Sequence, residues 1–208
     1  MLLALALSAY ILMALSGDLH FEYIPSLEDV KTELFGGGKP ADSNNNCEVH
    51  FIDVGQGDSA FILSDGQSIL IDGGENDKGD VVVSYLKKLG VSRIDMLIAT
   101  HPHSDHIGGL DTVINELSIG KILMPRLPEE QTPTTRTYTD LLTAIADKGL
   151  RITPAKAFNT YDFGEGRLEV LGPAANYDDL NNTSLVCKFT YGERKFLFTG
   201  DLSLIHIL

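Results

Sequence analysis

Side chains of the types that bind metal ions are concentrated in one stretch, Thr100-His-Pro-His-Ser-Asp-His106. His101 and His103 are two positions apart, so in an extended loop both imidazoles point to the same side. Asp105 and His106 add a carboxylate and a third imidazole. Neutral imidazole nitrogens and carboxylate oxygens are ligands of divalent metals such as zinc. The spacing therefore predicts a metal-binding loop rather than a polar surface loop whose histidines are accidental.

These side chains are too many for one tetrahedral site made from neighbouring residues alone. They suit two metal ions about 3.5–4 Å apart, the separation found in dinuclear hydrolytic sites. We predict that His101 and His103 hold one ion and that Asp105 and His106 hold the other. Two divalent ions, Zn²⁺ or Mn²⁺, lower the pKa of a bridging water so that hydroxide is available at neutral pH. The predicted chemistry is metal-dependent hydrolysis, with Asp105 essential for turnover.

The elements that must position this loop alternate between strands and helices. The apolar stretch 94–100 predicts a strand directly before the loop, and Gly108 and Gly109 let the following helix begin close beneath it. Apolar faces predict helices over 81–89, 110–117 and 138–148. Alternation and turns predict strands over 49–53, 59–63, 68–72, 121–124, 167–171, 184–191 and 195–199, with a hairpin turn at Asp65-Gly66. Early hairpins mixed with helices predict an α/β or α+β sandwich.

The composition excludes several classes of protein. The 208 residues, 43% of them hydrophobic, suffice for one globular domain with a sizeable core. A surplus of 29 Asp and Glu over 16 Lys and Arg gives a net charge of −13, which disfavours a general nucleic-acid-coating role. Cys47 and Cys187 belong to no CxxC pattern, which excludes a disulfide-dense scaffold and a Cys-rich zinc module. Whether these two cysteines pair is left open.

The N-terminal segment sets the expected compartment. Residues 1–16 are apolar at a length that favours a signal peptide, although no Lys or Arg precedes Lys31. The alternatives are a membrane anchor formed by the tail of a longer spanning helix, and a buried core helix. Residues 17–46 are interpreted as a linker, in which His20 has no evident partner. We expect a secreted or membrane-tethered, extracytoplasmic protein, associated with the membrane through this segment.

The metal-binding loop and the landmarks around it resemble the metallo-β-lactamase fold. Phe51-Ile-Asp-Val-Gly-Gln-Gly-Asp-Ser59 and Ile71-Asp-Gly-Gly74 precede the loop, and Asn182-Thr-Ser-Leu-Val186 and Phe198-Thr-Gly-Asp201 follow it. The Val-Gly-Gln-Gly-Asp-Ser stretch is similar to the ComEC-type DNA-uptake competence branch and its free-standing relatives. The resemblance covers about residues 47–201 and implies an α+β fold, the αββα sandwich.

The resemblance also implies roles for residues outside the loop. Asp201 matches the aspartate that bridges both metals, and Asp72 matches an aspartate that orients a ligand histidine. Asp58 and Asn182 lie in loops expected to border the site, and Asn182 stands roughly where many relatives have a third histidine. His50 alternates within a strand and is interpreted as structural.

The C-terminal stretch departs from the family pattern. The fold normally continues past the bridging aspartate to another ligand histidine, often within a His-His-Gly-Ser stretch. Here Asp201 is followed by an atypical apolar tail over 202–208, and His206 is not assigned as a ligand. We therefore expect a C-terminally truncated domain in which mainly the first half of the sandwich is present. Such a domain is expected to expose apolar sheet surface.

For this branch the resemblance implies phosphodiester hydrolysis, and hence a nuclease or phosphodiesterase related to DNA uptake. The expected partners are a phosphodiester or another small hydrolysable substrate, with DNA as one possibility, and the oligomeric state is not predicted. Two alternatives stay open. The same site could cleave β-lactam or thioester bonds, or the chain could be an incomplete, non-catalytic metal-binding domain.

Overall fold

The computed structural model describes residues 46–203 except 174 and 176, and these belong to a compact unit of the chain that begins at Ala41. The apolar segment 1–16, almost all of the linker, and His20 and His206 lie outside the described residues. In the part that the structure describes, no helix has the length and apolar character needed to cross a membrane.

Sheet A has six strands in the order β1-β2-β3-β4-β5-β6. They are β1 (Cys47–Phe51), β2 (Ala60–Ser64), β3 (Gln67–Ile71), β4 (Arg93–Ile98), β5 (Ser118–Met124) and β6 (Ile152–Pro154). β1, β2 and β3 pair antiparallel, and the predicted turn between β2 and β3 has both Asp65 and Gly66 at positive φ, as a tight hairpin requires. β3 to β6 pair parallel. The C-terminal ends of these four strands therefore meet at one edge of the sheet.

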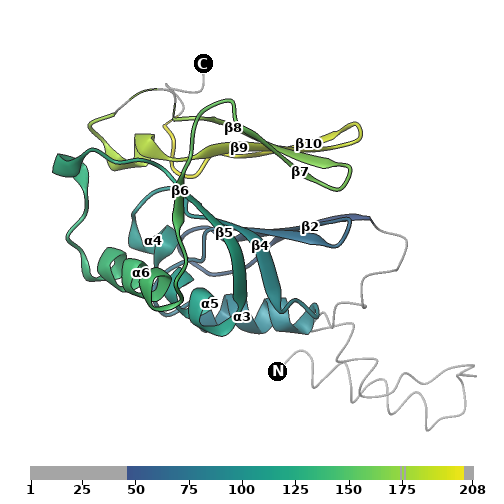
Figure 1. The fold of residues 1–208 in the computed structure, drawn as a ribbon, viewed down its shortest axis with the longest axis horizontal. Helices are drawn as coiled ribbons and strands as arrows, with labels where there is room; N and C mark the ends of the chain where they lie inside the picture. The colour runs from purple at the N-terminus through teal and green to yellow at the C-terminus, as the bar shows by residue number, and fades with distance from the viewer. Residues whose placement is uncertain (1–45, 174, 176, 204–208) are drawn as a thin grey trace, which may run out of the picture. The chain divides into compact units, whose positions relative to one another are not determined.

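Parallel neighbours need crossover connections, and helices supply them. α3 (Gly79–Lys88) joins β3 to β4, the short α4 (Ser104–Ile107) and α5 (Leu110–Glu116) join β4 to β5, and α6 (Arg136–Asp147) joins β5 to β6. α3, α5 and α6 lie together on one face of sheet A (Figure 1). The core between these helices and the sheet contains Phe61, Leu70, Leu86, Leu110 and Ile145 among its buried residues.

Sheet B lies over the other face of sheet A (Figure 1). Its four strands are antiparallel in the order β10-β9-β8-β7: β7 (Thr160–Phe163), β8 (Gly166–Gly172), β9 (Val186–Tyr191) and β10 (Arg194–Phe198). A second core fills the space between the sheets, with Ile62 and Ile69 from sheet A meeting Leu168 and Phe189 from sheet B. Successive residues of β3 divide between the two cores, because side chains alternate across a strand.

The predicted α+β sandwich is confirmed, with the layers helix, sheet and sheet. The predicted helices and most predicted strands occur within a few residues of their expected ends. β6, β7 and α4, which the sequence analysis does not predict, have three or four residues each. Segments this short contain too few repeats for hydrophobic periodicity to reveal them.

The expectation of an exposed apolar sheet surface is wrong for the described part of sheet B. Its outward-facing positions include Arg167, Glu169, Lys188 and Lys195, whereas the intervening residues face sheet A. Lys188 Nζ pairs with Glu169 Oε2 at 2.6 Å. Among the large apolar side chains facing outward here, Leu197 stands out at 53% exposed. The strands alternate between apolar and polar residues, so sheet B presents a hydrated face to solvent.

The two cysteines are free thiols. Cys187 is buried between the sheets, and burial, together with the negative charge of Asp72, raises its pKa to about 12. Cys47 is half-buried at the start of β1.

We predict that iodoacetamide leaves Cys187 unlabelled in the native protein, because a buried thiol that stays protonated is a poor nucleophile. After denaturation without reductant, both cysteines should be alkylated. Peptide mass spectrometry checks both results. A disulfide-linked peptide pair would contradict the structure.

Candidate metal centre

The predicted metal-binding loop lies at the edge of sheet A where the parallel strands end. Ala99 extends β4 through its N–H, which donates to Leu123 O at 3.0 Å. His101 and His103 follow, and His103 is the extended residue before the first turn of α4. Asp105 and His106 therefore belong to a short helical turn, whereas the first two histidines precede it.

Gly108 and Gly109, predicted to let the helix begin close beneath the loop, also allow a close approach to the connection between β3 and α3. A Cβ on Gly108 would lie 2.4 Å from Asn76 N, and one on Gly109 would lie 2.3 Å from Gly73 O. Gly73 N donates to His106 O at 2.7 Å, and Gly109 N donates to Gly74 O at 3.1 Å. The metal-binding loop is thus fastened by backbone hydrogen bonds to the loop that carries Asp72.

Three potential ligands, His101, His106 and Asp201, come together in the structure. Their ligand atoms all lie within 4.8 Å of one another. His106 Nε2 is 3.1 Å from Asp201 Oδ1, and His101 Nε2 is 3.9 Å from Asp201 Oδ2. Each carboxylate oxygen therefore faces a different histidine. The two imidazoles are buried, and the Asp201 side chain is 41% exposed, so the group is open to solvent on the side of Asp201.

Asp72 orients both buried histidines. It follows β3, is 1% exposed, and accepts hydrogen bonds from Thr100 N (2.8 Å), Thr100 Oγ1 (2.6 Å) and His106 Nδ1 (2.9 Å). The single hydroxyl proton of Thr100 goes to Asp72, so Thr100 Oγ1 accepts from Nδ1–H of His101 at 3.1 Å. With a proton on each Nδ1, the Nε2 atoms of both rings face Asp201.

The residues present fit a divalent metal ion. His101 Nε2 is buried and has no hydrogen-bond partner among the described residues, which is costly for a polar atom unless something binds it. Burial, assisted by the charges of His106 and His103, lowers the pKa of His101 to about 3, so this ring is neutral, as a ligand must be. Imidazole nitrogens with a carboxylate are a donor set typical of zinc and related metals.

His106 has the opposite pKa shift. Burial acts to lower its pKa, but the hydrogen bond and charge of Asp72, followed by the charges of Asp201 and Asp105, raise it to about 9. Without metal, the protonated ring links the two carboxylates. A cation that binds Nε2 takes the place of that proton, since the same anionic partners stabilise either positive charge.

His103 and Asp105 lie at the side of this group. The ring centroid of His103 is 4.9 Å from that of His101, and the ring is half-buried. Burial acts to raise the pKa of Asp105. A hydrogen bond from Gln56 and the charges of His106 and His101 nevertheless hold this pKa below its usual range. The assignment of His101 and His103 to one ion, and of Asp105 and His106 to another, stays a prediction.

The remaining predicted residues occupy different positions. Asp58 contacts Asp105 through its backbone, donating N–H to Asp105 O at 3.2 Å. Asn182 lies in the 3₁₀ turn η2 (Leu180–Thr183), and its Oδ1 accepts from Ser203 N at 3.2 Å. His50 bonds Tyr85 Oη and Glu48 Oε2 on the helix-facing side of sheet A. That placement fits the structural interpretation of His50.

Sequence reasoning missed three contributors to the site. Thr100 connects His101 to Asp72, Gln56 donates to Asp105, and Ser184 Oγ accepts from Asp201 N at 3.2 Å. Thr100 and Gln56 stand inside motifs that the sequence analysis quotes, so a signal was present. The residues that Thr100 and Gln56 contact, however, are either far away in the sequence or recognisable as partners only from the side-chain geometry of the folded chain.

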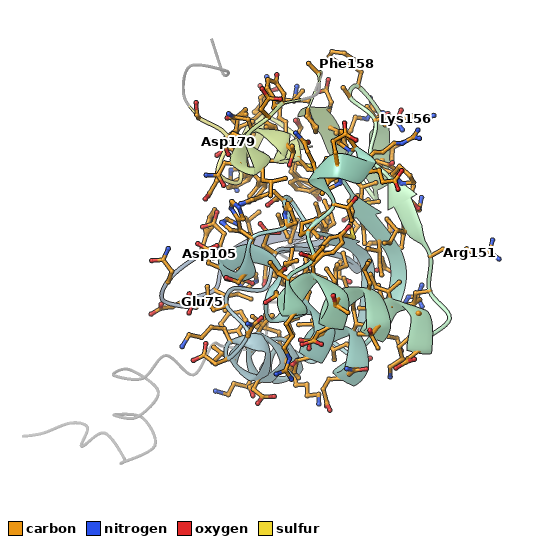
Figure 2. All side chains as sticks on the ribbon, turned by 90° about the vertical axis from the view of Figure 1, so that its left-hand side faces the viewer. Glu75, Asp105, Arg151, Lys156, Phe158 and Asp179 are labelled. Carbon is orange, nitrogen blue, oxygen red and sulfur yellow. The ribbon has the colours of Figure 1, made fainter. Side chains whose placement is uncertain are left out.

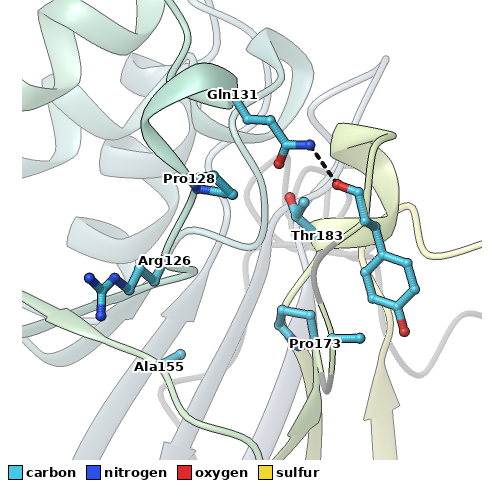
Figure 3. Close-up of a pocket in the computed structure, with 8 residues that line it drawn as sticks. Arg126, Pro128, Gln131, Ala155, Pro173 and Thr183 are labelled. Carbon is cyan, nitrogen blue, oxygen red and sulfur yellow. Dashed lines mark hydrogen bonds between the residues drawn. The ribbon is translucent and has the colours of Figure 1, made fainter.

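Two cavities lie near this edge. One, of about 210 Å³, is lined in part by Gly57, Asp58, Asp72, Thr100 and Gly200, and therefore adjoins the metal-binding loop. The other, of about 180 Å³, is bordered by Arg126 after β5, Gln131, Ala155 after β6 and Thr183 (Figure 3). Gln131 Nε2 donates to Tyr177 O at 2.8 Å across this second cavity.

Replacing Asp72 by Asn should weaken metal binding by about 10- to 100-fold, because the amide no longer supplies the charge that orients His106. Asn keeps the shape and tolerates the positive φ of this position, 58°. Equilibrium titration of the metal-free full chain with Zn²⁺ against a chelating dye measures the effect. Asp95→Asn, at the far end of β4, is the matched control. Equal affinities in all three proteins would contradict the role of Asp72.

The chain is similar to known proteins in sequence and in fold. The sequence profile of the "Metallo-beta-lactamase superfamily" matches residues 52–208. The chain is 28% identical over 178 residues to ComE operon protein 3 of Bacillus subtilis (strain 168). This match covers 74% of this chain and 22% of that protein. The chain is 50% identical over 52 residues to ribonuclease Z of Clostridioides difficile (strain 630), covering 25% of this chain and 16% of that protein.

A solved structure shows the same fold. A metallo-beta-lactamase of Cronobacter sakazakii, a variant of its HARLDQ motif, matches with a TM-score of 0.54 at 13% identity, covering 74% of this chain and 61% of that one. The chain spans about a fifth of the length of ComE operon protein 3. The profile covers well over half of the chain, and the similarity to the competence branch is confirmed by the match to ComE operon protein 3. The protein therefore belongs to the metallo-beta-lactamase superfamily, whose members are metallo-hydrolases.

Proposed function

We propose that the chain is a dinuclear metallo-hydrolase that cleaves phosphodiester bonds, as a nuclease or phosphodiesterase related to DNA uptake. The observation that carries the hydrolase proposal is the convergence of the buried His101 and His106 on both oxygens of Asp201. His103, before α4, would complete the ion site at His101, and Asp105, in α4, would complete the ion site at His106. When bound by these residues, two divalent ions, Zn²⁺ or Mn²⁺, would make hydroxide available at neutral pH and would stabilise charge on the attacked group.

The chain's own residues prepare this chemistry. Asp72 and Thr100 hold the two imidazoles in the tautomer whose Nε2 faces Asp201. Asp105 stays ionised, because its pKa is held below the usual range, and so contributes negative charge beside the histidines. Asp201 stands at the solvent-open side, where a substrate can approach. A site fixed in this way needs little rearrangement when the substrate arrives.

The proposal of a phosphodiester substrate is supported by the relatives. Ribonuclease Z is by its name a ribonuclease, and the Gly55-Gln-Gly-Asp-Ser59 stretch resembles the competence branch.

Electrostatics limits the mode of substrate binding. The net charge of −13 repels polyanions at a distance. Glu75, Asp105 and Asp179 lie along one side of the molecule in Figure 2. We therefore propose that the substrate is held locally, through its reacting phosphate and bound metal, and not by an extended basic surface. We also propose that the protein is extracytoplasmic, with the apolar segment 1–16 as its export signal or membrane anchor.

Replacing Asp105 by Ala should reduce turnover of a phosphodiester reporter by at least about 100-fold and leave the fold intact, since Asp105 is half-buried outside both cores. Asp147→Ala, an exposed aspartate at the end of α6, is the matched control and should keep full activity. The wild-type full chain is assayed with Zn²⁺ or Mn²⁺ on the reporter, a cephalosporin and a thioester.

Each result has a distinct meaning. Retained activity in the Asp105 variant contradicts its assignment to the site. Preference for the cephalosporin or thioester keeps the metallo-hydrolase and rejects the phosphodiester. If the wild-type chain binds metal but hydrolyses none of the three substrates, the non-catalytic alternative is favoured.

A further inference from the structure

The Gly55–Asp58 loop, which follows β1, is packed directly against Asp105. Gly57 has a φ of 91°, and a Cβ built there would lie 1.8 Å from Asp105 O. No side chain fits into that space. The loop therefore approaches the metal-binding helix α4 as closely as two backbones allow.

Backbone hydrogen bonds fix this approach. Asp58 N donates to Asp105 O at 3.2 Å, and Gly74 N donates to Asp58 O at 3.0 Å. The loop is therefore bonded to α4 on one side and to the connection after Asp72 on the other. Its position relative to the three-ligand group is set by the backbone and not by its own side chains.

From this fixed backbone, Gln56 reaches the carboxylate of Asp105. Its Nε2 donates to Asp105 Oδ2 at 3.2 Å. The Gln56 side chain is exposed, and this hydrogen bond joins two residues that both lie outside the cores. A role in holding the fold together therefore does not explain Gln56.

We propose that Gln56 is a positioning residue for the metal site, which holds the Asp105 carboxylate beside His106 and His101. The inference rests on the proposed function, in which Asp105 and His106 hold one of the two ions. Asp105 has a single carboxylate on a rotatable side chain, so a hydrogen bond to Oδ2 restricts its rotation. An amide is suited to this task, because it donates without the positive charge that would compete with a metal ion for the carboxylate.

The test compares Gln56→Leu with Gln67→Leu in the full, metal-free chain. Gln67, the first residue of β3, is also exposed, and its Oε1 accepts a hydrogen bond from Gly164 N, so the control makes the same chemical change away from the site. Titration with Co²⁺, followed by its d–d absorption, and competition of Zn²⁺ with a chelating dye give the affinities of the two ions separately. Thermal unfolding of each variant reports on the fold.

We expect Gln56→Leu to weaken the binding of one ion on the order of tenfold and to change its Co²⁺ spectrum, while the affinity for the other ion and the unfolding temperature are unchanged. Gln67→Leu should bind like the wild type. If Gln56→Leu binds both ions with unchanged affinity, the positioning role is overturned and the proposed function is left intact. An equal weakening of both ions has the same meaning. A wild-type chain that binds fewer than two ions overturns both proposals.

Discussion

The site depends on one buried carboxylate, that of Asp72. An ionised carboxyl group inside a protein is unfavourable unless donors surround it, and Thr100 and His106 supply three hydrogen bonds. These same bonds determine which nitrogen of each histidine carries a proton. Asp72 has a φ of 58°, a left-handed conformation that aspartate tolerates better than most residues. Burial raises the pKa of Asp72, and the hydrogen bonds from His106 and Thr100 counter only part of this effect.

Close backbone approach is the second constraint. Three segments that are separate in sequence, namely the loop after β1, the connection after β3 and the turn of α4, are joined by hydrogen bonds between main chains. Gly57, Gly108 and Gly109 stand where a Cβ would overlap a neighbouring backbone atom. The Gly-Gln-Gly-Asp-Ser stretch that resembles the competence branch therefore has a physical role, since it lets the chain pass beside Asp105. Asp201 arrives separately, from the end of sheet B, and Ser184 holds its backbone.

The fold positions the candidate metal ligands, whereas recognition of a substrate requires further groups around them. Helices, sheet A and sheet B place the ligands, and a related layering in a protein of 13% identity shows that the fold tolerates extensive sequence change. We expect substrate choice to depend on the loops around the site. An acidic protein can still act on a phosphodiester when bound cations neutralise the charge at the point of reaction. The proposed substrate thus rests on local chemistry and on the relatives.

The sequence by itself determined the candidate metal-binding loop, the order of the longer elements and the sandwich, because each of these is recorded in residues close together along the chain. Spacing predicted His101, His103, Asp105 and His106, of which His101 and His106 meet Asp201 in the structure, and a resemblance pointed to Asp72 and Asp201. The tertiary structure decided which atoms meet. The bridge from Thr100 to Asp72, the contact of Gln56 with Asp105 and the polar outer face of sheet B depend on the path of the folded chain. Hydrophobic periodicity specifies which face of an element is buried, but it carries no record of which polar side chains face one another across two loops.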